Sequence, residues 1–179
     1  MSQTPPLSFR AATPEDIPAT LALVRSAYRG EYSRMGWTTE ADLVADERID
    51  EAGMLVKITH PSSTILLAHD GAGDLAGCCE LVKKDDNLGY FGLFAVDPTR
   101  QAGGIGRSIL AQAEAHASGV WGVRRLEMWV IWTRQELISW YVRRGYVKTE
   151  RTEPFPYTDL INGMALRDDL HFAVLEKDL

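Results

Sequence analysis

Three consecutive β-type runs constrain the fold of this chain more than any other feature. The runs are "STILLAH", "LAGCCELV" and "GYFGLFAV", and the connections between them contain "DGAGD" and "KKDDN". Short connections rich in Gly, Asp and Asn favour β-hairpins, because these residues readily adopt the backbone angles of tight turns. Residues 63–96 are therefore predicted to form an antiparallel meander.

Segments of helical periodicity lie on both sides of this meander. The sequence "TPEDIPATLALVRSAY" predicts a first helix with Thr13 as its N-cap, and "TTEADLVADERIDEAGMLVKITH" predicts a second helical stretch capped by Thr38 or Thr39. After the meander, "GGIGRSILAQAEAHASG" and "TRQELISWYVRR" predict two more helices, and "RRLEMWVIW", "YVKTE" and "LHFAVLEK" predict strands. The order predicts a mixed sheet covered by helices.

Composition and charge narrow the class of protein. The chain has 179 residues, 45% of them hydrophobic, which is enough for one ordinary core. We predict a single domain over residues 1–179, with a disordered N-terminus at residues 1–6. No segment has the length or apolar character of a signal peptide or a membrane span, which predicts a cytoplasmic protein without a membrane partner. A net charge of −6 disfavours a nucleic-acid partner.

The two cysteines, Cys78 and Cys79, are neighbours in a predicted strand. Adjacent strand residues point to opposite faces, so this pair is not expected to form a disulfide or to hold a metal ion. The cysteine usage predicts a reduced protein without a cysteine-based metal site.

Three glycines within four positions, Gly103, Gly104 and Gly106, open the third predicted helix. A helix start exposes unpaired N–H groups and the positive end of the helix dipole, and glycine lets a bulky anion approach the backbone. The block therefore predicts a phosphate or pyrophosphate site. The other explanation is a loop that requires left-handed backbone angles.

Two common nucleotide motifs fail at particular positions. A P-loop requires Lys and then Ser or Thr directly after its last glycine, where this chain has Arg107 and Ser108. A dinucleotide fingerprint starting at Gly104 requires glycine where Ile109 stands, and it follows a βαβ unit instead of a meander. A nucleotide-binding protein stays as a third alternative.

A different family matches the same residues. The stretch "QAGGIG" (101–106), preceded by "FAVDP", resembles the Q/R-x-x-G-x-G/A signature of the GCN5-related N-acetyltransferase (GNAT) superfamily, and "WYVRRGY" (140–146) resembles its Y-x-x-x-G-F/Y stretch. The element order also matches over most of the chain. The resemblance implies an α+β fold with a central mixed, mostly antiparallel twisted sheet of about six or seven strands, flanked by about four helices.

The resemblance also implies a cosubstrate, acetyl-CoA, and no metal. In this family the glycine loop binds the pyrophosphate through backbone amides, and the preceding strand pairs with the pantetheine arm, with one amide polarising the thioester carbonyl. The positions implied for coenzyme binding are Phe94, Ala95, Val96, Gln101, Ala102, Gly103, Gly104, Ile105, Gly106, Arg107 and Arg134. At Arg134 many members have asparagine, so this contact must differ here or be absent.

Tyr141 is the implied proton donor to the leaving thiolate of coenzyme A. The alternative is a half-buried aromatic whose hydroxyl only finds a hydrogen-bond partner. A general base is expected as well, because an alkyl ammonium with a pKa of about 10.4 must lose a proton before it attacks. Glu80 interrupts an apolar run and is the candidate side chain; a solvated strand end and a water relay are the alternatives. Residues 90–93 contain no acid, which argues against the mechanism of the histone-modifying branch.

Aromatic residues in two loop-like stretches are the candidates for the acceptor pocket. They are Tyr28, Tyr32, Trp37, Phe155 and Tyr157. The predicted function is transfer of an acetyl group from acetyl-CoA to a primary amine by direct attack in a ternary complex. A non-catalytic acyl-CoA-binding sensor is the alternative. The sequence leaves open the identity of the acceptor and the oligomeric state, a homodimer included.

Overall fold

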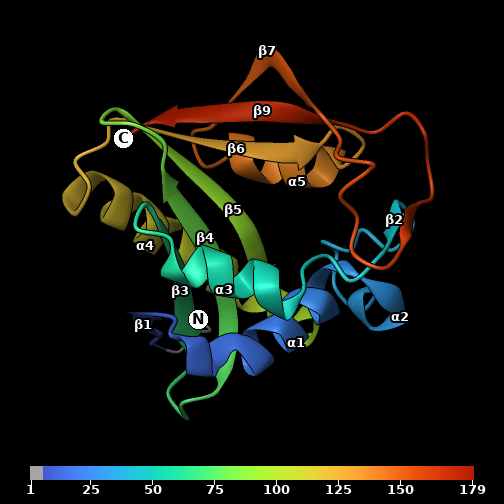
Figure 1. Ribbon diagram of the computed structural model, residues 1–179. Coiled ribbons are helices and arrows are strands. Elements are labelled where there is room, and N and C mark those ends of the chain that lie inside the picture. Colours follow the sequence, from blue (N-terminus) through green and yellow to red (C-terminus); the bar gives the residue numbers. More distant parts are fainter. Residues whose placement is uncertain (1–5) are drawn as a thin grey trace.

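A computed structural model describes residues 6–179, and its main element is a seven-stranded twisted sheet (Figure 1). The predicted disorder of residues 1–6 falls almost wholly outside the described residues; Pro6 itself precedes the first strand without regular structure. In spatial order the strands are β1 (Ser8–Ala11), β3 (Ser63–His69), β4 (Leu75–Lys83), β5 (Leu88–Val96), β6 (Arg125–Ile131), β9 (His171–Asp178) and β7 (Val147–Pro154).

The three predicted runs of the meander are β3, β4 and β5, which pair antiparallel in this order. All other neighbouring strands of the sheet are also antiparallel, except β5 and β6. The prediction of a mixed, mostly antiparallel sheet is confirmed, and so is the α+β fold class.

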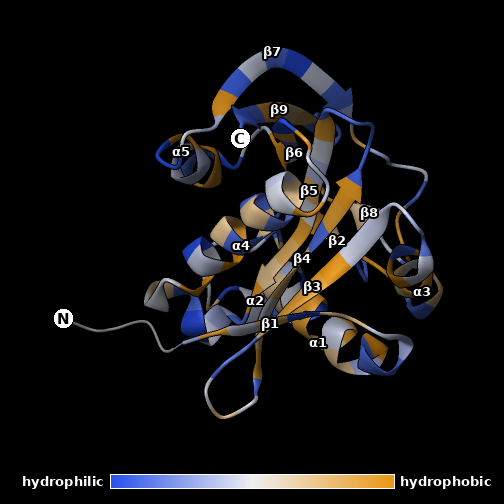
Figure 2. Cartoon of the chain, turned by 90° about the vertical axis from the view of Figure 1, so that its left-hand side faces the viewer, coloured by the Kyte–Doolittle hydropathy of each residue, from blue (hydrophilic) through white to orange (hydrophobic). Residues whose placement is uncertain are grey.

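Helices cover both faces of the sheet. On one face lie α1 (Ile17–Tyr28), which follows a 3-10 turn at Pro14–Asp16, and α3 (Glu51–Thr59). On the other lie α4 (Ile105–Gly119), which follows a 3-10 segment at Pro98–Gly103, and α5 (Gln135–Val142). Two separate apolar clusters result, one between each pair of helices and the sheet. The strand residues between these helix layers are predominantly apolar (Figure 2).

Cys78 and Cys79 show this alternation directly. Both are free and buried, and they belong to different clusters: Cys78 packs with α1 and α3, and Cys79 with α4. Within residues 6–179, no group of three or more His, Cys, Asp or Glu side chains is placed to hold a metal ion. No helix in the described part of the chain has the length and hydropathy needed to cross a membrane.

The second predicted helix is wrong in its first half. Residues 38–50 form turns and the short strand β2 (Val44–Ala45), which pairs with β8 (Met164–Ala165); this two-stranded sheet was not predicted. A helix cannot run through Arg48, whose φ is 67°. The helix begins only at Glu51, because Oδ1 of Asp50 accepts a hydrogen bond from Gly53 N at 2.7 Å and caps it. The short helix α2 (Gly30–Ser33) was missed as well.

One irregularity of the sheet determines where a site can form. The parallel pairing of β5 with β6 extends only from Leu88 to Tyr90, and beyond that point the two strands diverge (Figure 1). The pairing of β5 with β4 also shifts by one residue near Cys78, and Leu93 has a φ of 44° there. A bulge of this kind bends the strand away from its neighbour. The gap contains backbone groups without a strand partner.

Candidate functional site

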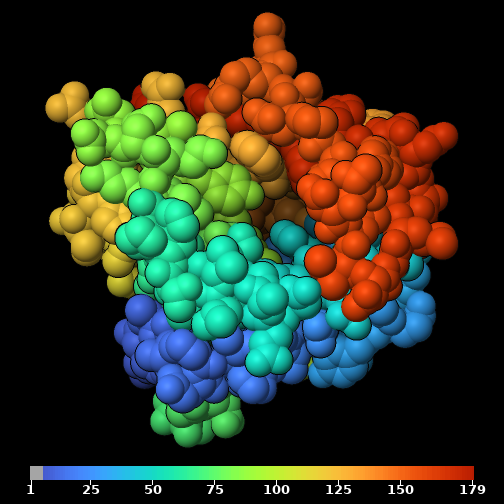
Figure 3. Space-filling view, viewed as in Figure 1, coloured from blue at the N-terminus to red at the C-terminus, as the bar shows by residue number. Residues whose placement is uncertain are grey.

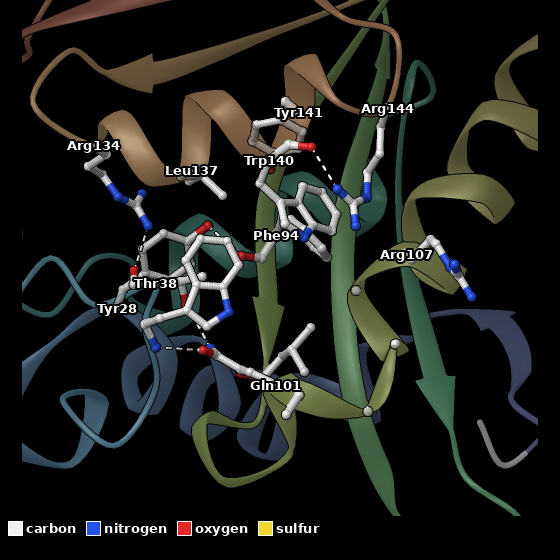
Figure 4. Close-up of a pocket in the computed structure, with 16 residues that line it drawn as sticks. Tyr28, Thr38, Phe94, Gln101, Arg107, Arg134, Leu137, Trp140, Tyr141 and Arg144 are labelled. Carbon is white, nitrogen blue, oxygen red and sulfur yellow. Dashed lines mark hydrogen bonds between the residues drawn. The ribbon is translucent and has the colours of Figure 1, made fainter. Parts of the chain in front are cut away.

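Two cavities lie at the gap between β5 and β6, and they have a wall in common. The first, of about 410 Å³, is bordered by the glycine loop and α5 (Figure 4). The second, of about 150 Å³, is bordered by the segment before α3 and the loop after β7. Figure 3 shows a hollow in the surface between the segment before α3 and the loop after β7. The residues that line both cavities are Tyr28, Phe94, Arg134, Leu137 and Tyr141.

The glycine loop supplies exposed backbone to the first cavity. Gly104 is the N-cap of α4 and has a φ of 77°, the left-handed conformation that favours glycine. A Cβ added at Gly103 would meet nothing within 4 Å, so the space beside this residue is open. No side chain caps the helix start, which leaves its first N–H groups and the dipole free for a ligand. The left-handed explanation of the glycine block is confirmed at Gly104, and the open backbone at Gly103 leaves room for the predicted anion, which stays a prediction.

Two arginines add positive charge to the same cavity. Arg107 is exposed and Arg144 half-buried, and neither forms an ion pair with any carboxylate in residues 6–179. The guanidinium of Arg144 lies 3.5 Å from the centre of the Trp140 ring, and its Nε is buried without a hydrogen-bond partner. Burial lowers the pKa of Arg144, and the charges of Arg143 and Arg107 lower it further. Arg107 and Arg144 repel each other, and Nε of Arg144 lacks an acceptor. An anionic group in the cavity would relieve both.

The carbonyls of β5 that face the gap accept hydrogen bonds from side chains. Phe94 O accepts one from Tyr28 Oη at 2.6 Å, and Val96 O accepts one from Gln101 Nε2 at 3.3 Å. Gln101 also accepts from Trp37 N at 2.9 Å and donates to Thr38 Oγ1 at 2.7 Å, which ties the loop after α2 to the glycine loop (Figure 4).

Most of the predicted coenzyme positions lie around the first cavity. Two do not. Ala95 faces the cluster beneath α1, and Ile105 is buried in the core under α4, so only their backbone groups are available. The predicted positions that line the cavity are Phe94, Val96, Gln101, Ala102, Gly103, Gly104, Gly106, Arg107 and Arg134.

Tyr141 lines both cavities, and Figure 4 shows it among the residues of the first. Its side chain is 4% exposed and packs edge-on against Phe91 and Trp140. Burial raises its pKa well above 10, and the nearby Tyr28 raises it further. The phenol therefore stays protonated at neutral pH, as a proton donor must.

The other candidate for chemistry, Glu80, lies elsewhere. Its carboxylate is buried and accepts two hydrogen bonds from Lys57 Nζ of α3, both at 2.8 Å. It lines neither of the two cavities.

Arg134 takes part in an ion-pair network that its sequence position did not suggest. Its Nη1 lies 2.5 Å from Oε1 of Glu40, and its Nη2 donates to Thr38 O at 2.5 Å. Arg29 bridges the other oxygen of Glu40 and Oδ1 of Asp46, both at 2.5 Å. Burial opposes ionisation of Glu40, but Arg134, Arg29 and Arg48 outweigh it and hold its pKa below the ordinary value of 4.5.

The aromatic residues predicted for the acceptor pocket separate into three places. Tyr28 lines both cavities, and Trp37 lines the first. Tyr32 is 52% exposed and lines neither. The Tyr157 hydroxyl accepts a hydrogen bond from Leu170 N at 2.7 Å, and its ring lies outside both cavities. Phe155 lines the second cavity, together with aromatics that sequence patterns did not single out for it; they are Tyr90, Phe91, Trp129 and Phe172.

A mostly antiparallel sheet with one diverging strand pair and a glycine loop beside it is the architecture of a class of acyl-transfer enzymes. The family is shown by the sequence itself. A model of the acetyltransferase (GNAT) family matches residues 21–146, which is more than half of the chain, and the chain belongs to this family. It is an N-acetyltransferase of the type that uses acetyl-CoA as cosubstrate.

Solved structures show the same fold at low sequence identity. A variant of the spermidine N-acetyltransferase SpeG from Vibrio cholerae has a TM-score of 0.70 at 16% identity, covering 95% of this chain and 92% of its own. An IAA acetyltransferase from Bacillus cereus has a TM-score of 0.67 at 16% identity, covering 97% and 100%. A chimera of the Vibrio cholerae enzyme with hSSAT has a TM-score of 0.69 at 15% identity, covering 96% and 95%. No curated protein has a sequence that matches the chain significantly.

Proposed function

We propose that this enzyme transfers the acetyl group of acetyl-CoA to a primary amine of a small acceptor by direct attack in a ternary complex. One observation supports this most directly: the two cavities lie side by side at the β5–β6 gap, and Tyr141 lines both. A direct transfer requires such an arrangement, because both reactants must be present together with their reacting atoms in contact.

The first cavity is assigned to coenzyme A. The N–H groups from Gln101 to Arg107 would bind the pyrophosphate, with Arg107 and Arg144 as additional cations. The backbone of Phe94 and Val96 faces the gap and would pair with the pantetheine arm, exchanging the side-chain partners Tyr28 and Gln101 where necessary. When bound, the coenzyme supplies the thioester, and the amide of Val96 would polarise its carbonyl.

The second cavity is assigned to the acceptor. Its amine would enter the gap beside Phe94 and attack the thioester carbonyl from the side opposite the glycine loop. Attack breaks the C–S bond, and Tyr141 donates its proton to the departing sulfur. The amine proton leaves through water, since the one candidate carboxylate of the sequence, Glu80, is held by Lys57 outside both cavities.

Thiol release with acetyl-CoA and a varied panel of amines tests this proposal. We expect release with at least one amine class, saturable in both substrates, with intersecting lines in initial-velocity plots. Binding of acetyl-CoA without release across the panel, and without an effect of Tyr141→Phe on any measured property, would instead support the acyl-CoA sensor.

A further inference from the structure

The charges that line the second cavity do not all neutralise one another. Arg29, Glu40, Asp46 and Arg134 are joined by ion pairs of 2.5 Å and are each about nine-tenths buried or more at the side chain. Two cations and two carboxylates balance within this network. These four side chains are therefore occupied with one another and offer little net charge to a ligand.

Arg48 is the remaining cation of the lining. Its guanidinium has no carboxylate within ion-pair distance and no hydrogen-bond partner anywhere in residues 6–179; only its backbone N–H is bonded, to Asp46 Oδ1 at 3.0 Å. The guanidinium carbon lies 5.2 Å from the centre of the Tyr28 ring. Burial raises the pKa values of Tyr28 and Tyr90, two tyrosines of the cavity wall, and the positive charge of Arg48 lowers them in part. An unpaired cation therefore faces the acceptor site.

The backbone holds Arg48 in an unfavourable conformation. Its φ of 67° is left-handed, which is uncommon for a residue with a long side chain. The turn is fixed on both sides, by the Asp46 carboxylate and by a hydrogen bond from Ile49 N to Glu47 O at 2.8 Å. Strained residues of this kind persist where surrounding contacts over-determine them, and they concentrate at ligand sites.

From these observations we infer that Arg48 binds an oxyanion of the acceptor, in the first place a carboxylate, so that the substrates are small amines that carry a negative group, such as amino acids. This inference rests on the proposed function. A guanidinium binds a carboxylate through two parallel charge-assisted hydrogen bonds, and a partly buried one gains most from such a partner.

Three features of the surroundings agree with this substrate class. The rings of Tyr90 and Trp129 form an aromatic wall, and Lys84 Nζ, which lies outside the lining, is 5.9 and 5.6 Å from their centres. The cavity volume of about 150 Å³ suits a small molecule or the end of a larger one. Asp159 is the lining carboxylate without a cationic partner among the described residues; it is exposed, and it is available to attract the ammonium form of the amine.

Pairs of amines that differ only in the acidic group provide the test. We would compare leucine with isoamylamine and phenylalanine with phenethylamine, and add the phosphonate analogue of each amino acid, using thiol release to measure kcat/KM. We expect the carboxylate member to be preferred by roughly 10- to 100-fold, the usual effect of a charge-assisted hydrogen bond. A higher kcat/KM for the phosphonate than for the carboxylate would keep the oxyanion site and change its preferred anion.

Arg48→Met should remove this preference by raising KM for the acidic acceptor, whereas the Kd of coenzyme A should stay close to that of the wild type. Arg48→Lys should keep part of the preference. Arg34→Met is the matched comparison. Arg34 is another loop arginine, but its partners Glu31 and Asp42 are exposed acids, and it lines neither cavity. Calorimetric binding of the amino acid to the coenzyme-saturated enzyme, with thermal melting of every variant, separates ligand contact from unfolding.

The outcomes distinguish this inference from the proposed acetyltransferase function on which it rests. Efficient turnover of neutral amines or polyamines, with no gain from an acidic group or with a gain that survives in folded Arg48→Met, would overturn the role of Arg48 and leave the acetyltransferase intact. Absence of thiol release with every amine, acidic or not, would overturn both.

Discussion

The two cavities have one wall in common, but the chain builds them in opposite ways. Most of the first cavity comes from two short stretches, residues 94–107 and 134–144, and it depends largely on backbone groups. The second is assembled from seven separate segments between Tyr28 and Phe172, and it depends on side chains. A local backbone motif can therefore keep the first cavity constant, while substitutions in scattered loops change the second. The residues of the shared wall, Tyr141 among them, must suit the contents of both cavities.

The largest expected effect lies on that wall. Tyr141→Phe should reduce kcat by about 10²- to 10⁴-fold, because the departing thiolate loses its proton donor. The Kd of coenzyme A, measured by calorimetry, should change little. Since burial keeps the pKa of Tyr141 well above 10, activity should show no decline from its ionisation below pH 10.

Tyr146→Phe is the matched variant for this experiment. Tyr146 stacks edge-on with Tyr141 at 5.8 Å, is equally buried, and donates a hydrogen bond to Glu114 at 3.0 Å, but it lines neither cavity. It should lose stability and retain kcat. Equal losses of kcat and coenzyme affinity in Tyr141→Phe would make Tyr141 a packing residue and leave the two cavities without a common catalytic group.

The next largest effect should be a loss of folding stability when the ion-pair network of the second cavity is broken. Glu40→Gln removes the carboxylate that joins Arg29 to Arg134 and leaves two buried guanidinium groups undercompensated. Breaking a buried pair in this way should cost about 3 kcal/mol of unfolding free energy in urea titrations at pH 7. Asp42→Asn, which removes an exposed partner of Arg34, should behave like the wild type.

The pH dependence of this difference follows from the lowered pKa of Glu40. A carboxylate whose pKa is lower in the folded state stabilises the protein above its unfolded pKa, here about 4.5, and loses this contribution as pH falls through the folded value. The gap in unfolding free energy between the wild type and Glu40→Gln should therefore shrink below pH 4.5. A gap that is constant down to pH 3 would mean that the cost arises from packing.

The sequence predicted the first cavity far better than the second, and the reason is physical. The glycine block, the meander before it and Tyr141 lie at fixed local distances along the chain, so that a pattern can specify them. By contrast, the pairing of Arg134 with Glu40 spans 94 positions and leaves no local trace. The prediction of a helix over residues 38–50 was wrong for a related reason. The backbone at Arg48 has a positive φ, and an arginine in the sequence does not indicate such a turn.

A substitution at Gly103 tests the backbone character of the first cavity. Gly103→Val should weaken coenzyme A binding by about tenfold or more without lowering Tm, because its side chain would enter the open space in which the anion approaches the amides. Gly104→Val is less informative, since its φ of 77° adds strain to any steric effect. Gly71→Val in the β3–β4 hairpin also has open space around it and should leave the Kd unchanged. If the Kd survives in Gly103→Val, the phosphates bind elsewhere.

The smallest effects are expected from the two arginines of the first cavity. Arg144→Met should weaken coenzyme binding by roughly tenfold, since it removes a partly buried cation that stacks on Trp140. Arg107 is exposed, and solvent screens its charge, so Arg107→Met should cost only about threefold. The contribution of Arg107 should also fade in 1 M salt, whereas that of Arg144 should persist in part. Arg143→Met, at an exposed position outside this cavity, is the comparison. An equal loss at Arg143 would indicate that α5 acts through its overall charge, and the donor site would then depend on side-chain electrostatics as much as the acceptor site does.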